Sequence, residues 1–219
     1  MSEQRPFTVE QVVAAPREEV WRALTELDQV AEWFGWDHPG FQGEIQFIFA
    51  DYAKTSAPER IEWDNGQDIT LEADGDRTVV RVTMAGPADD SSWEDFYDGL
   101  REGWRSFFEQ LRFWVERRPT GRRRTLFLTG ELVPAAAVAT AEESGVREVW
   151  HRSHFQHQFV DDEGHLIVVN AQVPLTSQDE AQVGITITTY GLTDADFASL
   201  RARWETRWST AARNHEVTV

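Results

Sequence analysis

The chain contains one arrangement of a strand and a long aromatic helix twice. The alternating strand pattern of residues 80–86 recurs at residues 185–191, and each copy is followed by apolar residues at helical spacing. The matching helix positions are Tyr97, Leu100, Trp104 and Phe108 in the first copy, and Phe197, Leu200, Trp204 and Trp208 in the second. Each copy of such a repeat has its own apolar face to bury. We therefore expect an α+β protein of two modules in tandem; the alternative is a single long domain whose periodicity is a coincidence.

The first half contains every element that a module of its own requires. Alternating or β-branched runs predict strands, and Pro16, which is followed by acidic residues, predicts the start of a helix. The expected strands cover residues 7–14, 41–49, 59–63, 68–73 and 78–84, and the expected helices begin at Pro16 or cover residues 29–34 and 93–115. In the strand expected at residues 41–49, Phe41, Ile45, Phe47 and Phe49 share one face.

The second half repeats this order in a shortened form after an arginine-rich linker. The linker, residues 117–124, contains Pro119, Gly121 and five arginines, which favour a solvated hinge, with a phosphate site as the alternative. The expected strands cover residues 124–133, 147–151, 154–160, 166–173 and 182–190, and the expected helices begin at Pro134 and cover residues 193–213. We expect a first domain of residues 1–118 and a second domain of residues 119–219.

The charge of the chain excludes several kinds of partner. Its formal net charge is −17 at pH 7, and its pI is about 4.7. Such a charge repels phosphate backbones and acidic lipid surfaces, so we expect neither nucleic acid nor a membrane as a partner. The absence of cysteine excludes disulfides and thiol nucleophiles. Because the sequence shows no apolar signal core and no apolar run of about 18 residues, we expect a cytoplasmic protein.

Two ordered motifs near the N-terminus carry a family resemblance. Val-Val-Ala-Ala-Pro-Arg-Glu-Glu-Val-Trp-Arg-Ala-Leu at residues 12–24 is followed by Val-Ala-Glu-Trp-Phe at residues 30–34. The strand pair that ends at Gly86 and the Gly103-Trp104 pair of the long helix follow in order. Residues 1–118 thereby resemble START-like (SRPBCC) proteins, in particular the Aha-type branch of heat-shock ATPase activators. The second half matches the same pattern more weakly.

The resemblance implies a helix-grip fold, in which a curved antiparallel sheet wraps around a long C-terminal helix. For this chain it implies two tandem helix-grip modules, the second shortened. Family members usually hold a lipophilic ligand between sheet and helix. Some are polyketide cyclases or aromatases, and others bind antibiotics, including enediynes. Lys54 is the only lysine, a bias typical of a high-GC bacterium such as an actinomycete, where members often lie in polyketide gene clusters.

Three functions follow from the resemblance, in a definite order. The first is binding of an apolar polyketide- or polyene-like molecule in an internal cavity, in secondary-metabolite biosynthesis or self-resistance. The second is catalysis as a polyketide cyclase or aromatase. The third is a co-chaperone-like interaction module, which would use an exposed patch rather than a cavity. The sequence decides neither the ligand nor the oligomeric state, and it does not distinguish a carrier from an enzyme.

Large apolar side chains, together with His157 as a polar lining residue, are the candidates for lining such a cavity, because ligand pockets are mostly apolar and aromatic. In the first module they are Trp33, Phe34, Trp36, Phe41, Phe47, Phe49, Trp63, Met84, Tyr97, Leu100, Trp104 and Phe108; in the second they are Phe155, His157, Phe197, Trp204 and Trp208. The alternative for each of them is ordinary core packing, which periodic apolar residues usually serve. Gly103 inside the long helix would leave room for a ligand or for a close strand.

The polar candidates for chemistry are few. His151, His154 and His157 do not converge on a strand or on a helix, so we expect no metal site. No Gly-rich phosphate loop, Gly-x-Ser-x-Gly elbow or zinc-protease motif is present, and we expect no cofactor. If the protein is an enzyme, the candidates for acid–base work are His38, Glu44, Tyr97 and Tyr190.

Overall fold

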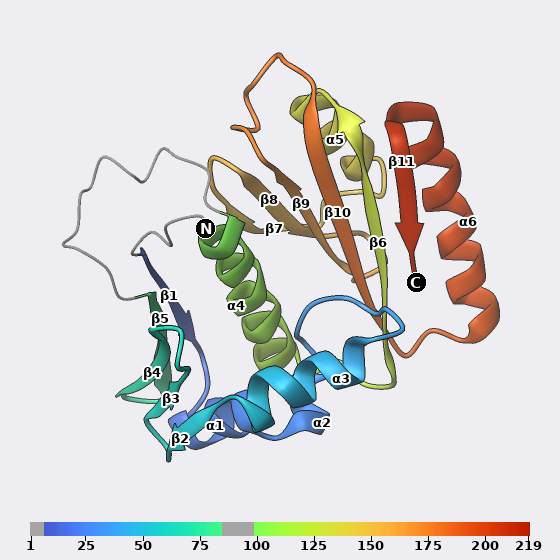
Figure 1. Ribbon diagram of the computed structural model, residues 1–219. Helices are drawn as coiled ribbons and strands as arrows, with labels where there is room; N and C mark the ends of the chain where they lie inside the picture. The colour runs from blue at the N-terminus through green and yellow to red at the C-terminus, as the bar shows by residue number, and fades with distance from the viewer. Residues whose placement is uncertain (1–6, 85–98) are drawn as a thin grey trace. The chain divides into compact units, whose positions relative to one another are not determined.

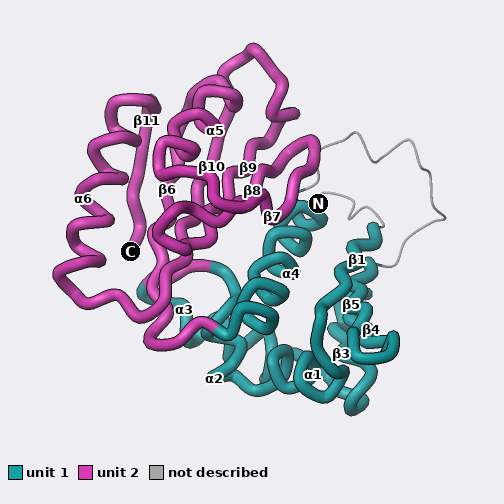
Figure 2. Tube along the Cα trace, turned by 180° about the vertical axis from the view of Figure 1, so that it is seen from behind, with its two compact units in different colours: residues 1–35, 39–118 teal, residues 36–38, 119–219 magenta. Residues whose placement is uncertain are grey.

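The computed structural model describes residues 7–84 and 99–219, and it divides the chain into two compact units. Unit 1 comprises residues 1–35 and 39–118, and unit 2 comprises residues 36–38 and 119–219 (Figure 2). Each unit contains its own antiparallel sheet and its own buried apolar cluster. The three residues 36–38 therefore leave the body of unit 1 and pack as part of unit 2.

Unit 1 is built on a five-stranded antiparallel sheet of order β1-β5-β4-β3-β2. The strands are β1 (Phe7–Val13), β2 (Lys54–Ser56), β3 (Arg60–Glu62), β4 (Gln67–Asp74) and β5 (Arg77–Met84). The first strand pairs with the last, so that Phe7 lies opposite Met84 and Val13 lies opposite Thr78. Alternate residues of β5 are buried, which is the period expected when one face of a sheet covers a core.

Helices cover that core. They are α1 (Arg17–Thr25), α2 (Leu27–Val30), α3 (Phe41–Gln46), the π-helix η1 (Phe47–Asp51) and α4 (Gly99–Arg117). Pro16 precedes α1, and α4 lies along β1 (Figure 1). From α4, Trp104, Phe108 and Leu111 enter the buried cluster of unit 1. The expected part of this helix at residues 93–98 lies outside the described residues.

The strand expected at residues 41–49 is wrong, because this segment is helical. Phe41, Ile45 and Phe49 are spaced by four residues, which places them on one face of a helix as well as on one face of a strand. All three are buried, but Phe47 is 56% exposed and stacks on Tyr52. An apolar pattern this short fits both periods, and packing against the core of unit 1 selects the helix.

Unit 2 contains a six-stranded antiparallel sheet of order β11-β6-β10-β9-β8-β7. The strands are β6 (Arg123–Leu132), β7 (Glu148–Arg152), β8 (Gln156–Val160), β9 (Leu166–Ala171), β10 (Ala181–Tyr190) and β11 (Arg213–Thr218). As in unit 1, the first strand pairs with the strand that precedes the long helix. The sequence analysis did not predict β11. Its first four residues, Arg213, Asn214, His215 and Glu216, are polar and show no apolar alternation that would indicate a strand.

The helices of unit 2 are α5 (Pro134–Glu142) and α6 (Asp194–Ala211). Pro134 occupies the first turn of α5, and Thr193 caps α6 by accepting a hydrogen bond from the Asp196 N–H. Residues 143–147 connect α5 directly to β7 without counterparts of α2 and α3. The predicted fold class is confirmed: the protein is α+β, with two antiparallel sheets that are each followed by a long helix.

The length and composition of the helices show whether any of them could cross a membrane. Within residues 7–84 and 99–219, no helix combines the length and the apolar character that a bilayer crossing demands.

Candidate functional site

The interior of unit 1 contains a closed circuit of five aromatic rings. Phe34 contacts Phe49, Phe49 contacts Trp63, Trp63 contacts Trp104, Trp104 contacts Phe107, and Phe107 returns to Phe34. The centroid separations along this circuit are 5.0, 6.3, 5.9, 5.9 and 4.4 Å. Aromatic pairs attract one another at these separations. We call these five residues the aromatic circuit.

Four separate parts of the chain supply the aromatic circuit. Phe34 follows α2, Phe49 lies in η1, Trp63 follows β3, and Trp104 and Phe107 lie one turn apart on α4. Trp33 and Phe108 extend the cluster behind it, because Trp33 packs edge-on against Phe49 at 6.0 Å and Phe108 contacts Trp104 at 5.6 Å. Phe107 is the half-buried member, whereas the other four are buried.

Backbone carbonyls hold the indoles of Trp63 and Trp33 in place. Trp63 Nε1 donates to the Ile48 carbonyl in η1 at 2.8 Å, and Trp33 Nε1 donates to the Ala23 carbonyl at 2.7 Å. Gln110 of α4, with its amide nitrogen turned toward them, donates to the carbonyls of Trp33 and Gly35 at 3.1 Å each. Because the polar atoms of the indoles are satisfied by the backbone, the rings present only apolar surface to one another.

Most of the residues predicted to line a cavity in the first module are buried in unit 1, but three are not part of its interior. Trp33, Phe34, Phe41, Phe49, Trp63, Met84, Trp104 and Phe108 all belong to the buried cluster. Phe47 and Leu100 are 56% and 42% exposed, so neither side chain is interior. Trp36 belongs to unit 2, where its ring stacks on Phe127 at 4.0 Å. Tyr97 lies outside the described residues.

The sequence prediction omitted Phe107 from the site, although the residue closes the aromatic circuit. It lies three positions after Trp104, and residues three apart are neighbours on one helix face. A Cβ added at Gly103 would meet the Phe107 ring at 3.9 Å, an ordinary contact. Gly103 therefore lies beside the Phe107 ring without a side chain of its own.

The candidates in unit 2 are buried in its own interior. Phe197, Trp204 and Trp208 of α6 belong to the buried cluster of unit 2, and Trp208 Nε1 donates to the Thr129 carbonyl at 2.8 Å. Phe155 and His157 are also buried. The three histidines do not form one strand: His151 lies on β7, His157 lies on β8, and His154 lies in the turn between them.

His157 is a buried imidazole whose surroundings lower its pKa. Its Nε2 lies 3.1 Å from Glu142 Oε1, and Arg152 Nε donates to its Nδ1 at 3.3 Å. Burial and then the Arg152 charge lower the pKa of His157 below the ordinary imidazole value, and Glu142 offsets these effects only in part. The imidazole is therefore neutral near pH 7 and suited to hydrogen bonding rather than to carrying charge.

The sequence analysis did not single out a second buried histidine, His165, which pairs with Asp161. Asp161 Oδ1 accepts the His165 N–H at 2.8 Å, and its Oδ2 lies 3.2 Å from His165 Nδ1. Both residues lie at the ends of the turn that joins β8 to β9, so this pair fixes the turn. The spacing of four residues across an Asp-Asp-Glu-Gly turn is the signal that could have identified it.

The weak catalytic candidates are distributed over both units. Glu44 is exposed on α3 of unit 1. His38 and Tyr190 belong to unit 2 and are half-buried. Tyr97 is not among the described residues. Within residues 7–84 and 99–219, no group of three His, Asp or Glu side chains is placed so that it could hold a metal ion.

Several solved structures resemble this chain at low sequence identity. Among solved structures, DynU16, a protein of the dynemicin biosynthetic locus, is 16% identical over 94% of this chain and 96% of its own, with a TM-score of 0.36. BexL, a di-domain ARO/CYC protein of the BE-7585A biosynthetic pathway, is 15% identical over 94% of each chain, with a TM-score of 0.37. CalU16 from Micromonospora echinospora is 18% identical over 53% of this chain and 77% of its own, with a TM-score of 0.35.

No curated protein matches the chain in sequence. The family model that matches is that of the Activator of Hsp90 ATPase homolog 1-like proteins, and the match covers residues 14–116. These residues include α1, the sheet strands β2 to β5 and nearly all of α4. Residues 14–116 thus match the family model of the AHSA1-like proteins.

Proposed function

We propose that unit 1 binds an apolar, unsaturated small molecule among the rings of its aromatic circuit. The observation that carries this proposal is the closure of the circuit: five rings from four parts of the chain meet in one interior. Ring faces and edges favour conjugated or aromatic guests, and the Trp63 N–H is already bonded to the Ile48 carbonyl. A polyene or a fused-ring polyketide has this chemistry.

Two features of the circuit favour a guest rather than a core alone. Phe107 is half-buried, so one ring of the circuit is partly exposed, and Gly103 beside it has no side chain. Phe49 lies on a π-helix, an element that occurs frequently at functional sites. Entry of a ligand would separate Phe107 from Phe34 while the hydrogen-bonded Trp63 stays in place.

The experiment is a titration of the full chain with a linear polyene and with a fused-ring aromatic polyketide. Quenching of tryptophan fluorescence reports proximity to the indoles, and a rise of the thermal midpoint reports binding to the folded state. We expect saturable quenching together with a raised midpoint for at least one of the two compounds. The absence of both effects for both compounds would overturn the proposal.

The repeat supplies a matched control for the site. Trp104 and Trp204 occupy corresponding positions on α4 and α6, and both are buried. We expect Trp104→Leu to weaken binding about tenfold or more, which corresponds to roughly 1.4 kcal/mol. Trp204→Leu should leave the affinity within about twofold, although it also costs core stability. Equal losses in both variants would place binding elsewhere. Phe107→Leu, at the half-buried ring, repeats the test with a smaller effect on folding.

A further inference from the structure

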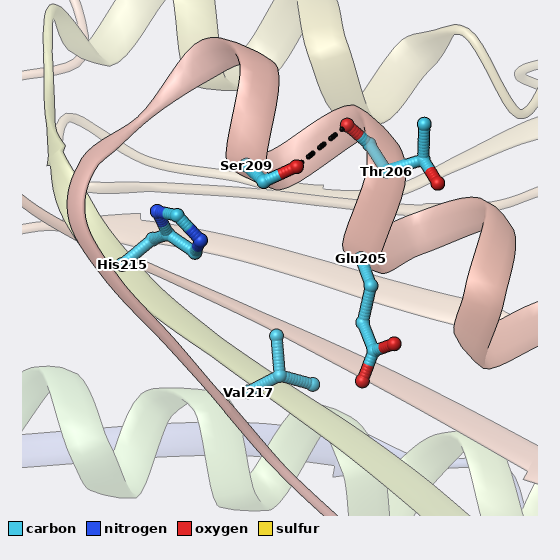
Figure 3. A pocket seen from close by; sticks show the side chains of 5 residues that line it. All are labelled: Glu205, Thr206, Ser209, His215 and Val217. Carbon is cyan, nitrogen blue, oxygen red and sulfur yellow. Dashed lines mark hydrogen bonds between the residues drawn. The ribbon is translucent and has the colours of Figure 1, made fainter.

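A groove in unit 2 lies between the outer side of α6 and the strand β11. Glu205, Thr206 and Ser209 of α6 line it together with His215 and Val217 of β11, and the Thr206 side chain points away from the two strand residues (Figure 3). Its volume is about 420 Å³, which is within the range of small-molecule sites. The groove uses no residue of the aromatic circuit, and β11 forms its wall by pairing with β6.

The hydroxyl groups of Thr206 and Ser209 both donate their hydrogens to backbone carbonyls of α6. Thr206 Oγ1 donates to the Ala202 carbonyl at 2.9 Å, and Ser209 Oγ donates to the Thr206 carbonyl at 3.1 Å (Figure 3). A hydroxyl that donates to its own helix keeps only lone pairs for other partners. Ser209 Oγ therefore presents an acceptor, and not a donor, to a ligand in the groove.

Glu205 and His215 add two further acceptors. Arg201 Nε donates to Glu205 Oε1 at 2.6 Å, and this ion pair is exposed, with 44% and 39% of the two side chains accessible. Ion pairs at such sites contribute little, so the carboxylate can take a second donor. The His215 ring can accept a hydrogen bond at a nitrogen that carries no proton. Val217 contributes an apolar wall beside these polar groups.

We propose that this groove binds the ammonium group of a small primary amine, with its alkyl chain against Val217. An alkylammonium carries one positive charge, three N–H donors and no acceptor, which complements the Glu205 carboxylate, the Ser209 hydroxyl oxygen and a ring nitrogen of His215. The net charge of −17 attracts cations to the whole protein, and the groove supplies the specific contacts. The site is open to solvent, so binding in the millimolar range is expected.

The test uses n-butylammonium and its uncharged analogue n-butanol on the full chain at about 150 mM salt, which screens nonspecific attraction. Backbone and His215 ring shifts are followed by NMR. We expect saturable shifts of residues 205–217 with n-butylammonium and none of comparable affinity with n-butanol. Equal responses to both compounds would show that the groove recognises the alkyl chain alone, and no saturable shift would show that it recognises neither; both results overturn the proposal.

A charge-matched pair of variants locates the site. Glu205→Gln and Glu216→Gln remove the same charge, but Glu216 is the neighbour of His215 and Val217 on the opposite face of β11. We expect Glu205→Gln to weaken n-butylammonium binding about tenfold and Glu216→Gln to change it by less than about twofold. Similar losses in both variants would mean that the amine responds only to net charge, and the proposal would then fail.

Discussion

Gly121 and Gly191 pack backbone against backbone at the point where unit 2 begins β6 and leaves β10. A Cβ on Gly121 would lie 2.5 Å from Gly191 Cα, and a Cβ on Gly191 would lie 2.8 Å from the Thr120 carbonyl oxygen. Both residues have positive φ, 86° and 69°, and the Gly191 N–H donates to the Arg122 carbonyl at 3.0 Å. This contact ties the end of the linker to the turn that precedes α6.

Gly191→Ala should destabilise the protein by about 2–4 kcal/mol, because it adds a steric clash to a left-handed backbone. Gly75→Ala is the control, since Gly75 has a similar φ of 65° with no atom within 4 Å of an added Cβ. The control should cost only about 1–2 kcal/mol. Urea denaturation of both variants measures the difference. Equal costs would show that conformation alone, and not the close approach, requires glycine at position 191.

Asp37 completes an edge of the unit 2 sheet. β11 covers β6 between Phe127 and Glu131, and Thr125 lies beyond that range. There the Asp37 carboxylate accepts the Thr125 N–H at 2.8 Å, and the Asp37 N–H donates to Thr125 Oγ1 at 2.6 Å. Asp37→Ala should cost about 1–3 kcal/mol, since the Thr125 N–H loses a charged acceptor.

A double-mutant cycle with Thr125→Val measures this coupling in urea. Residues that share hydrogen bonds couple by about 0.5–3 kcal/mol. Asp76→Ala, at an exposed aspartate, is the control and should stay within about 0.5 kcal/mol of the parent. Strictly additive effects of Asp37→Ala and Thr125→Val would contradict a direct partnership between the two residues.

His157 should make stability depend on pH below neutrality. Its pKa is lowered in the folded state, so the unfolded chain takes up a proton that the folded protein refuses. Stability is thus fully present above the ordinary imidazole pKa of about 6.5 and falls as the pH drops below it, with a slope of at most about 1.4 kcal/mol per pH unit. Thermal midpoints between about pH 7.5 and 5 should fall less in His157→Gln than in the parent. His154→Gln, at an exposed histidine, should retain the parent slope.

Phe47 and Phe49 distinguish the helix of residues 41–51 from the strand that alternation predicts. On a strand the two rings would share a face, and their substitutions would cost similar amounts. In the structure Phe49 is buried and Phe47 is exposed. Phe49→Ala should cost about 3–5 kcal/mol, and Phe47→Ala should cost less than about 1 kcal/mol, chiefly the stack with Tyr52. Comparable losses in the two variants would favour the strand.

The sequence alone determined the order of most elements, because local periodicity reports which face of an element is buried. Strands β1, β4 and β5, the helices that follow Pro16 and Pro134, the long helix α6 and the C-terminal end of α4 all lie within a few residues of their predicted positions. Spacing also predicted that Trp104 and Trp204 would be buried at corresponding places of a repeat. The resemblance at residues 12–34 predicted the family.

Tertiary structure alone decided the features that depend on contacts between distant segments. Residues 41–51 satisfy two periods, and only the packing of Phe41, Ile45 and Phe49 makes them helical. Residues 213–218 become a strand because the β6 edge offers hydrogen-bond partners, and that strand creates the groove beside α6. Four separate parts of the chain meet in the aromatic circuit. Local periodicity encodes burial within an element, whereas the positions at which separate elements meet depend on the fold as a whole.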